Sequence, residues 1–342
     1  MNFLSFTLPK KLDLLLIVRG IVAILVIYWH LRGHIDRNNF LASFFIVPGR
    51  LAVWIFFMMS GYLIGYGLIH GRYSKSLKGM KEFYINRIIR VYPIFLVLSL
   101  VGLLISQTSQ VINFDFIVQQ LFMFQWEHSY LLNGVFWTLG IEMHFYLIAP
   151  LLIFSSMKLF SPFINWSIGL YCFAWLVLYI WAESDLFNNW DIRNLLGNIT
   201  QFLVGFICAH NKKYIINLFI NKKLIVALII VIFTAYFNYN YDNYDMRNVF
   251  AGMKMIFVSN IIGFGIIVLH IVIEYKMIPS NLFIKFLSIL GILSYGIYAW
   301  HGLLSSNSIF IDNFILHTTL SIFMAYFSYF LIEKQFLKLK YQ

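Results

Sequence analysis

Charge and cysteine are scarce in this sequence. Only 11% of its 342 residues are charged and 61% are hydrophobic, whereas soluble domains carry about 25% charged residues. No stretch between the hydrophobic segments is long enough for a soluble enzyme domain, so any chemistry must be carried out by helices and short loops. The two cysteines, Cys172 and Cys208, lack CxxC spacing, so neither a disulfide framework nor a metal site is predicted.

The sequence also lacks a linker, a low-complexity tract, a convincing internal repeat and a cleavable signal peptide. Its first hydrophobic segment is too long for the core of a signal peptide, and no small-residue cleavage pattern follows it. We therefore expect one membrane domain over residues 1–342, with no fused soluble domain.

Hydropathy predicts an all-α polytopic membrane protein with about ten transmembrane helices. The predicted spans are 13–31, 50–69, 91–107, 135–155, 163–182, 195–210, 223–239, 249–273, 283–304 and 310–332. Most of the 25 basic residues lie on the side of the N-terminus, and acidic residues gather in the opposite loops. By the positive-inside rule both termini are then cytoplasmic. The net charge of +11 thus indicates membrane orientation, with no need for a nucleic-acid partner.

Arg19 lies inside the first hydrophobic segment, and His30 follows eleven residues later. On an α-helix this spacing is three turns plus about 20°, so both side chains share one face, about 16 Å apart along the axis. An arginine in hydrocarbon costs about 2.5–3.5 kcal/mol even on the lenient insertion scale. This cost marks Arg19 as a candidate functional residue, with His30 as its partner on the same helix face.

The predicted topology places three further candidates near the outer surface. His30 lies at the outer end of the first span, Glu142 about two turns into the fourth, and His301 near the outer end of the ninth. A histidine is the usual general base near neutral pH, and a carboxylate can fix its tautomer. His30 could equally be a residue at a helix end, and His301 a packed or interfacial residue.

The inner end is predicted to be cationic. Arg87 and Arg90 stand at i and i+3, which puts both on one helix face, and Arg19 lies in the inner half of its span. Together they would hold an anionic phosphate carrier. The alternative is that Arg87 and Arg90 are ordinary topological anchors.

Two long loops are predicted. The inner loop runs over about 70–90 and leads into the third span, and the outer loop covers about 108–134. The outer loop holds aromatic and amide side chains and no Lys or Arg. Such side chains suit a sugar, although they also fit an interfacial belt.

Six short segments stand in order along the chain. They are Leu12-Asp13 with Arg19-Gly20 and His30, Phe56-Phe57 with Ser60-Gly61, Arg87 and Arg90 before Pro93, Trp137-Thr138 with Glu142, Ser294-Tyr295 with Trp300-His301, and Ser328-Tyr329 with Glu333. From about residue 12 to residue 337 they resemble the acyltransferase-3 family of integral membrane O-acyltransferases. Thr138 stands where the family usually has serine, and His144 stands where many members carry glutamine.

The resemblance implies transfer of an acyl group, expected to be acetyl, from cytoplasmic acyl-CoA to a hydroxyl of a cell-surface or lipid-linked glycan. It implies His30 as the central catalytic residue, with Arg19, Arg87, Arg90 and Glu142 as further essential positions. We expect Arg87 and Arg90 to bind the donor and Glu142 to assist His30. Arg19 could bind the donor as well, or pair with Asp13 or Glu142 in a structural role. The expected partners are the bilayer, acyl-CoA, a glycan acceptor and proteins of the same biosynthetic cluster, with no permanently bound cofactor. The expected location is a bacterial inner membrane.

A transporter or flippase for a lipid-linked saccharide is the rival interpretation. Intramembrane Arg and Glu also suit a substrate pathway, but the sequence shows no inverted repeat and no paired Gly/Pro-broken helices. A membrane sensor or scaffold is a third possibility, and it would predict no loss of envelope acetylation on deletion.

Overall fold

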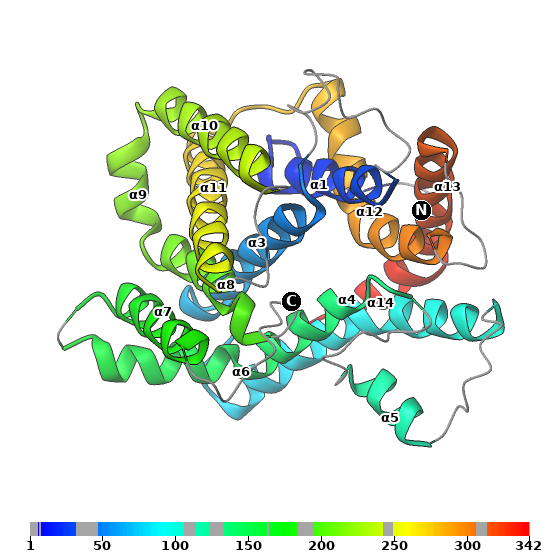
Figure 1. The fold of residues 1–342 in the computed structure, drawn as a ribbon, viewed down its shortest axis with the longest axis horizontal. Coiled ribbons are helices and arrows are strands. Elements are labelled where there is room, and N and C mark those ends of the chain that lie inside the picture. The colour runs from blue at the N-terminus through cyan, green and yellow to red at the C-terminus, as the bar shows by residue number, and fades with distance from the viewer. Residues whose placement is uncertain are drawn as a thin grey trace.

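The computed structural model describes residues 6, 8–31, 47–105, 114–123, 133–162, 164–183, 195–241, 249–305 and 313–341. Within these ranges the chain is almost entirely helical, and the one β-type contact in them is an isolated bridge between Lys11 and Pro279. Figure 1 shows the helices packed as one bundle. The all-α architecture predicted from hydropathy is confirmed.

The helices follow the apolar segments of the sequence closely. They are α1 (Leu14–Leu31), α3 (Gly49–Ile69), α4 (Leu77–Ile105), α5 (Phe114–Phe122), α6 (Trp137–Phe160), α7 (Trp166–Glu183), α8 (Leu195–His210), α9 (Lys212–Phe219), α10 (Lys223–Tyr241), α11 (Val249–Lys276), α12 (Leu282–Leu304), α13 (Phe314–Ser328), a π-helical turn η3 (Tyr329–Glu333) and α14 (Lys334–Leu337). Among the described residues, eight helical segments are long and apolar enough to cross a membrane, and α7 and α8 are shorter apolar helices. The ten predicted spans therefore all correspond to helices of a multi-pass membrane protein.

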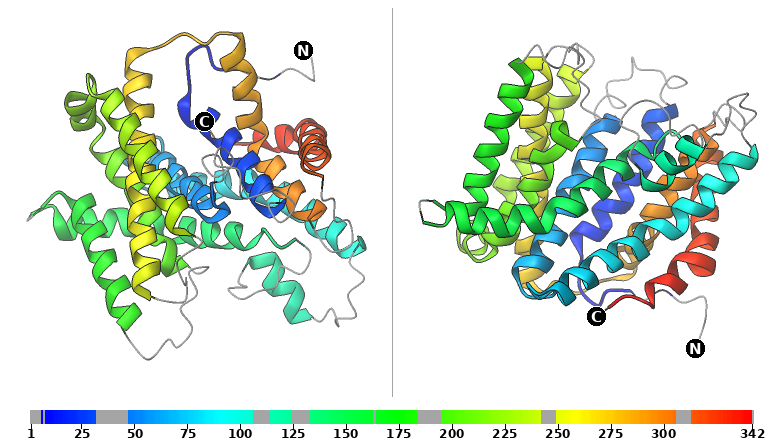
Figure 2. Two further views of the ribbon diagram at one scale, coloured as in Figure 1. Left: turned by 45° about the horizontal axis from the view of Figure 1, so that its top comes forward. Right: turned by 90° about the horizontal axis from the view of Figure 1, so that it is seen from below.

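Helix α3 lies at the centre of the bundle, between α1 and α8 (Figures 1 and 2). Small residues let these helices approach closely. A Cβ atom at Gly205 on α8 would lie 2.2 Å from the Tyr62 backbone nitrogen on α3, and one at Gly291 on α12 would lie 1.9 Å from the Leu16 carbonyl oxygen on α1. These two contacts set the position of α1, α3 and α12, the helices that carry Arg19, Ser60 and Tyr295.

The predicted inner loop over 70–90 is wrong in its second half. Helix α4 begins at Leu77 rather than at residue 91, so it already includes Arg87 and Arg90, which were expected to share one helix face. Residues 77–90 alternate lysines with apolar side chains such as Phe83, which is fully buried. A hydropathy window averages the lysines with the apolar residues, whereas the folded helix turns them to different faces. For the same reason the short helix α9 was not anticipated.

The predicted outer loop is described only in part. Helix α5 occupies Phe114–Phe122 and residues 133 onward are described. Phe124, Gln125 and Trp126, which carried part of the expectation of a sugar-binding surface, lie outside the described residues.

Candidate active site

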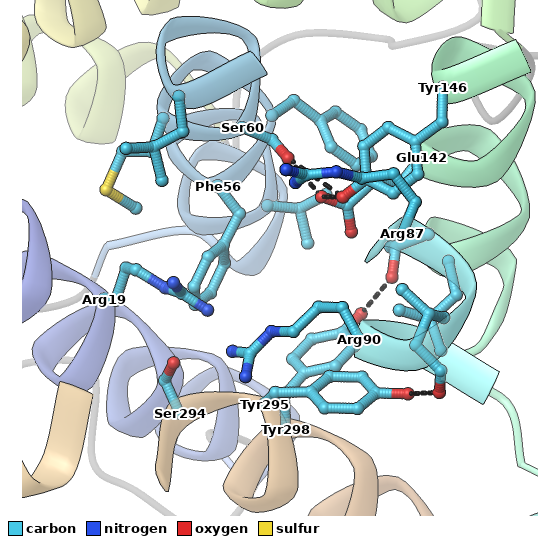
Figure 3. A pocket seen from close by; sticks show the side chains of 17 residues that line it. Arg19, Phe56, Ser60, Arg87, Arg90, Glu142, Tyr146, Ser294, Tyr295 and Tyr298 are labelled. Carbon is cyan, nitrogen blue, oxygen red and sulfur yellow. Dashed lines mark hydrogen bonds between the residues drawn. The ribbon is translucent and has the colours of Figure 1, made fainter. Parts of the chain in front are cut away.

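A cavity opens between five helices, and Figure 3 shows its interior. Together with the part open to solvent, it contains about 850 Å³ of empty space. Its charged and polar lining comes from α1 (Arg19), α3 (Ser60), α4 (Arg87 and Arg90), α6 (Thr138, Glu142 and Tyr146) and α12 (Ser294, Tyr295 and Tyr298). We call this space the arginine cavity, because three guanidinium groups face one carboxylate across it.

Arg87 and Arg90 project from one face of α4 into the cavity (Figure 3). The Arg87 guanidinium carbon lies 5.5 Å from the ring centroids of both Phe83 and Tyr146. Arg90 lies 5.7 Å from the ring centroid of Tyr295. Cation–π contacts of this kind hold a guanidinium in place without neutralising its charge. The aromatic contacts therefore leave the positive charge of Arg87 available inside the cavity, whereas Arg90 also has a carboxylate nearby.

A single buried carboxylate lies behind Arg90. Glu333, in the π-helical turn η3, has a side chain only 3% exposed, and its Oε2 lies 3.9 Å from Arg90 Nη1. Neither carboxylate oxygen has a hydrogen-bond partner in the described part of the chain. π-helical turns are frequent at functional sites because they re-aim side chains. Here the turn directs Glu333 toward the cationic wall of the cavity.

Glu142 points into the cavity from α6, opposite Arg19 (Figure 3). Its Oε1 accepts short hydrogen bonds from the Ser60 hydroxyl and the Tyr146 hydroxyl. Those two hydroxyl oxygens lie 3.2 Å apart. A carboxylate fixed by two hydroxyl donors is pre-oriented and keeps its second oxygen free to act on another group.

His30 does not line the arginine cavity. It is exposed near the end of α1, with Nδ1 3.0 Å from the Val26 carbonyl oxygen. Its ring centroid lies 5.2 Å from that of His301. The His301 ring in turn lies 5.2 Å from the ring of Tyr298, which does line the cavity. The three rings form a continuous series from the cavity wall to exposed His30.

His301 is the buried member of this series. Its side chain is 0% exposed, and neither ring nitrogen has a hydrogen-bond partner among the described residues. The Tyr298 hydroxyl lies 2.9 Å from Thr138 Oγ1 and donates to the Val135 carbonyl oxygen at 3.1 Å. Tyr298 is thus fixed by α6 while its ring separates the cavity from the two histidines.

The structure regroups the residues predicted from sequence. Arg19, Arg87 and Arg90 lie together as expected, and His30 lies beside His301. The expectation that Glu142 lies at the far end, apart from the arginines, is wrong, because Glu142 shares their cavity. Depth along a span assumes parallel helices, whereas α4 and α6 run obliquely across the bundle (Figure 2). Because these helices cross obliquely and arginine side chains are long, the three guanidinium groups and the Glu142 carboxylate reach the same cavity.

Several cavity residues were missed by sequence reasoning. Tyr146 stands four residues after Glu142, a spacing that places both side chains on one helix face and that could have flagged it. Ser60, Tyr295 and Tyr298 lie within the six segments, as does Glu333 behind the cavity wall, but none of them was given a role, because serine and aromatic residues are common throughout this chain. Among the described residues no group of three or more His, Cys, Asp or Glu side chains is placed to hold a metal ion.

The bundle and its cavity define a multi-pass membrane protein with a cationic internal site. The sequence profile of the acyltransferase domain family matches residues 13–333. The chain belongs to this family, as its six segments indicated.

Curated relatives are similar over nearly the whole chain. The O-acetyltransferase OatA of Staphylococcus aureus (strain NCTC 8325 / PS 47) is 27% identical over 367 aligned positions, covering 95% of this chain and 57% of that protein. The putative O-acetyltransferase SACOL0978 of Staphylococcus aureus (strain COL) is 24% identical over 363 positions, covering 94% of this chain and 56% of that protein. The chain thus spans little more than half the length of these relatives. No solved structure matches it.

Proposed function

We propose that this protein transfers an acyl group, most simply acetyl, from acyl-CoA to a hydroxyl of a cell-surface or lipid-linked glycan. The observation that carries the proposal is the arginine cavity, in which three guanidinium groups converge between helices of an acyltransferase family member. A phosphate-rich donor needs such a site, because guanidinium groups bind phosphate through paired hydrogen bonds. The names of the relatives favour acetyl as the group transferred.

The donor end of the reaction would lie in the cavity. Arg87 and Arg90 would hold phosphate oxygens of the CoA moiety, and Arg19 would neutralise further charge. The pantetheine arm would run along Tyr298 toward the histidines. Glu142, fixed by Ser60 and Tyr146, would lie beside the bound donor, where its negative charge would partly offset the positive charge of the arginines.

The acceptor end would lie at His30. The imidazole takes the proton of the acceptor hydroxyl while that oxygen attacks the thioester carbonyl. A new ester bond forms, the carbon–sulfur bond breaks, and the CoA thiolate leaves and is protonated. In a stepwise route His30 first carries the acyl group as an acyl-imidazole, and the overall bonds formed and broken are the same. His301 lies beside His30 and would support the imidazole in either route.

The expected membrane is the bacterial cell membrane, with both termini on the cytoplasmic side. This orientation follows from the distribution of basic residues and places the donor, which is made in the cytoplasm, on the side of the arginines.

The test is transfer of label from acetyl-CoA by the purified, reconstituted protein to a glycan acceptor. We expect wild-type protein to consume labelled acetyl-CoA and His30→Ala to lose transfer by a factor of 100 or more, within the range of about 10² to 10⁴ for a general base. His70→Ala is the matched control, because that histidine contacts the Ala209 carbonyl oxygen, away from the cavity lining. A wild-type protein that moves a lipid-linked saccharide without consuming acetyl-CoA would establish the transporter alternative instead.

A further inference from the structure

One cation near the arginine cavity has no role in the proposed reaction. Lys340 lies in the segment Lys338–Tyr341, which follows α14. Asn86, only 1% exposed, holds this segment against α4. Its Oδ1 accepts from the Tyr341 backbone N–H at 2.9 Å, and its Nδ2 donates to the Tyr341 carbonyl oxygen at 3.0 Å. Because Asn86 directly precedes Arg87, this segment ends close to the part of α4 that carries the cavity arginines.

The same amide reaches a third part of the chain. Asn86 Nδ2 also lies 3.2 Å from the Tyr73 hydroxyl oxygen, to which it donates. Tyr73 stands in the turn before α4, and the guanidinium carbon of Arg72 lies 5.6 Å from its ring centroid. One buried amide therefore gathers the turn, α4 and the segment after α14 around a common point.

Lys340 is surrounded by positive charge. The groups that act on it electrostatically are Arg90 and Arg87 on α4, Arg72 in the turn and Arg19 on α1. No carboxylate pairs with it in the described part of the chain. Lys338, two residues earlier, is exposed and donates to the Gln335 side chain at 2.6 Å. Lys340 thus differs from its neighbour in being partly buried, and Asn86 holds the adjacent residue Tyr341 close to Tyr73, which directly follows Arg72.

The positive charge in this region affects the pKa values of two groups outside the membrane-spanning segments, Lys340 and Tyr73. Burial, followed by the charges of Arg90, Arg87, Arg72 and Arg19, lowers the pKa of Lys340 to about 7. Burial raises the pKa of Tyr73, but the Asn86 hydrogen bond and the charges of Arg87 and Arg72 outweigh it and leave that pKa below its usual value. Such a concentration of positive charge is unfavourable unless an anion joins it.

We propose that Lys340 and Arg72 form a second phosphate subsite beside the arginine cavity, for the phosphomonoester of a nucleotide donor. This inference rests on the proposed function, because it assigns one end of the same acyl-CoA donor. Arg87 and Arg90 then serve the diphosphate. When the phosphomonoester binds, its negative charge favours the ammonium form, so Lys340 takes up a proton from solvent.

The pH dependence has a defined sign. The free site holds Lys340 neutral above about pH 7, whereas the occupied site holds it protonated. Binding is therefore strongest near pH 7, since the phosphomonoester itself takes up a proton below about pH 6. It weakens as the pH rises above 7, by up to about tenfold per pH unit until the pKa of the occupied site is reached. Arginine side chains do not deprotonate in proteins, so Lys340 is the group that changes.

The experiment measures the affinity of the full-length protein for CoA and for 3′-dephospho-CoA, which lacks the phosphomonoester, at pH 7.0 and 8.5. The wild type should bind CoA more tightly than dephospho-CoA, and only CoA binding should weaken at pH 8.5. Lys340→Met should bind CoA about tenfold more weakly at pH 7.0 and dephospho-CoA unchanged. Lys340→Arg should keep the affinity for CoA and abolish its loss at pH 8.5. Lys338→Met is the control and should match the wild type.

The outcomes separate the two proposals. CoA binding that is strong in the wild type and unchanged in Lys340→Met would overturn the phosphate subsite and leave the acyl-CoA donor standing. A wild-type protein that binds neither nucleotide would overturn both. Equal losses of CoA and dephospho-CoA affinity in Lys340→Met would show that the lysine holds the fold or another part of the donor, and would also overturn the subsite.

Discussion

Two groups of charged side chains lie inside this helix bundle, and they are built differently. The arginine cavity has three guanidinium groups and one carboxylate in its lining. The second group, which we call the ion cluster, consists of Asp13, Lys212, His270 and Glu274. There Lys212 Nζ lies 2.7 Å from Glu274 Oε2, and the His270 ring nitrogens lie 3.8 Å from Asp13 and 3.9 Å from Glu274.

The difference lies in charge balance. In the ion cluster two carboxylates, Glu274 of α11 and Asp13 just before α1, lie beside Lys212 of α9 and His270 of α11, so the cluster ties helices together. In the cavity the cations outnumber the acids: Arg87 rests on aromatic rings, and Arg90 contacts the Tyr295 ring as well as the Glu333 carboxylate. An excess of one sign inside a membrane bundle is costly without a ligand. This difference supports the proposal that the arginine cavity, and not the ion cluster, binds the donor.

Removing the cavity cations should have the largest effect. Arg87→Ala with Arg90→Ala deletes two charge-assisted phosphate contacts, each worth about 1.5–3 kcal/mol, so the affinity for CoA should fall by more than 100-fold. Isothermal titration of the reconstituted protein measures it. If the affinity for CoA is retained, the arginines are topological anchors, and the cavity, like the ion cluster, has no part in donor binding.

A change in the shared helix should disturb both groups. Helix α1 carries Arg19, and Asp13 accepts a hydrogen bond from the Leu16 backbone N–H at its first turn. Gly291→Ala places a Cβ atom 1.9 Å from the Leu16 carbonyl oxygen, so α1 must move, at a cost of about 1–3 kcal/mol. We expect a lower melting temperature and weaker CoA binding together. A variant with normal stability would show that the contact between α1 and α12 is not rigid.

Neutralising the cavity carboxylate should have a smaller effect of opposite sign on the donor. Glu142→Gln keeps an oxygen that accepts from Ser60 and Tyr146 but removes a negative charge near the donor phosphates. We expect CoA binding to strengthen by about threefold at low salt while acetyl transfer slows. Weaker CoA binding in this variant would instead mean that Glu142 orients an arginine.

The smallest effect is expected in the ion cluster. Lys212→Met removes the partner of Glu274, whose side chain is 50% exposed, and exposed ion pairs contribute about 0–1 kcal/mol. The melting temperature should fall slightly and the CoA affinity should stay the same. A large loss of CoA binding would instead show that the ion cluster, like the arginine cavity, contributes to the donor site.

Much of the site was visible in the sequence because charge inside a hydrophobic segment is conspicuous. Arg19 and Glu142 stood out for that reason, and the Arg87–Arg90 spacing showed that both share one face. The position of Glu142 relative to the arginines was not visible, and neither was the start of α4. The Ser60–Glu142 hydrogen bond joins residues 82 apart in sequence, and the Asn86–Tyr341 bond joins residues 255 apart. No local pattern encodes such pairings.

The sequence by itself determined that the chain is an all-helical membrane protein of the acyltransferase domain family, because hydropathy and short motifs are local properties. Only the tertiary structure decided that Glu142 faces the arginines, that Tyr298 and His301 lie between the cavity and His30, and that the segment with Lys340 is held against α4. These relations depend on how the helices cross and how closely their small residues allow them to approach, and both are set by packing across the whole bundle.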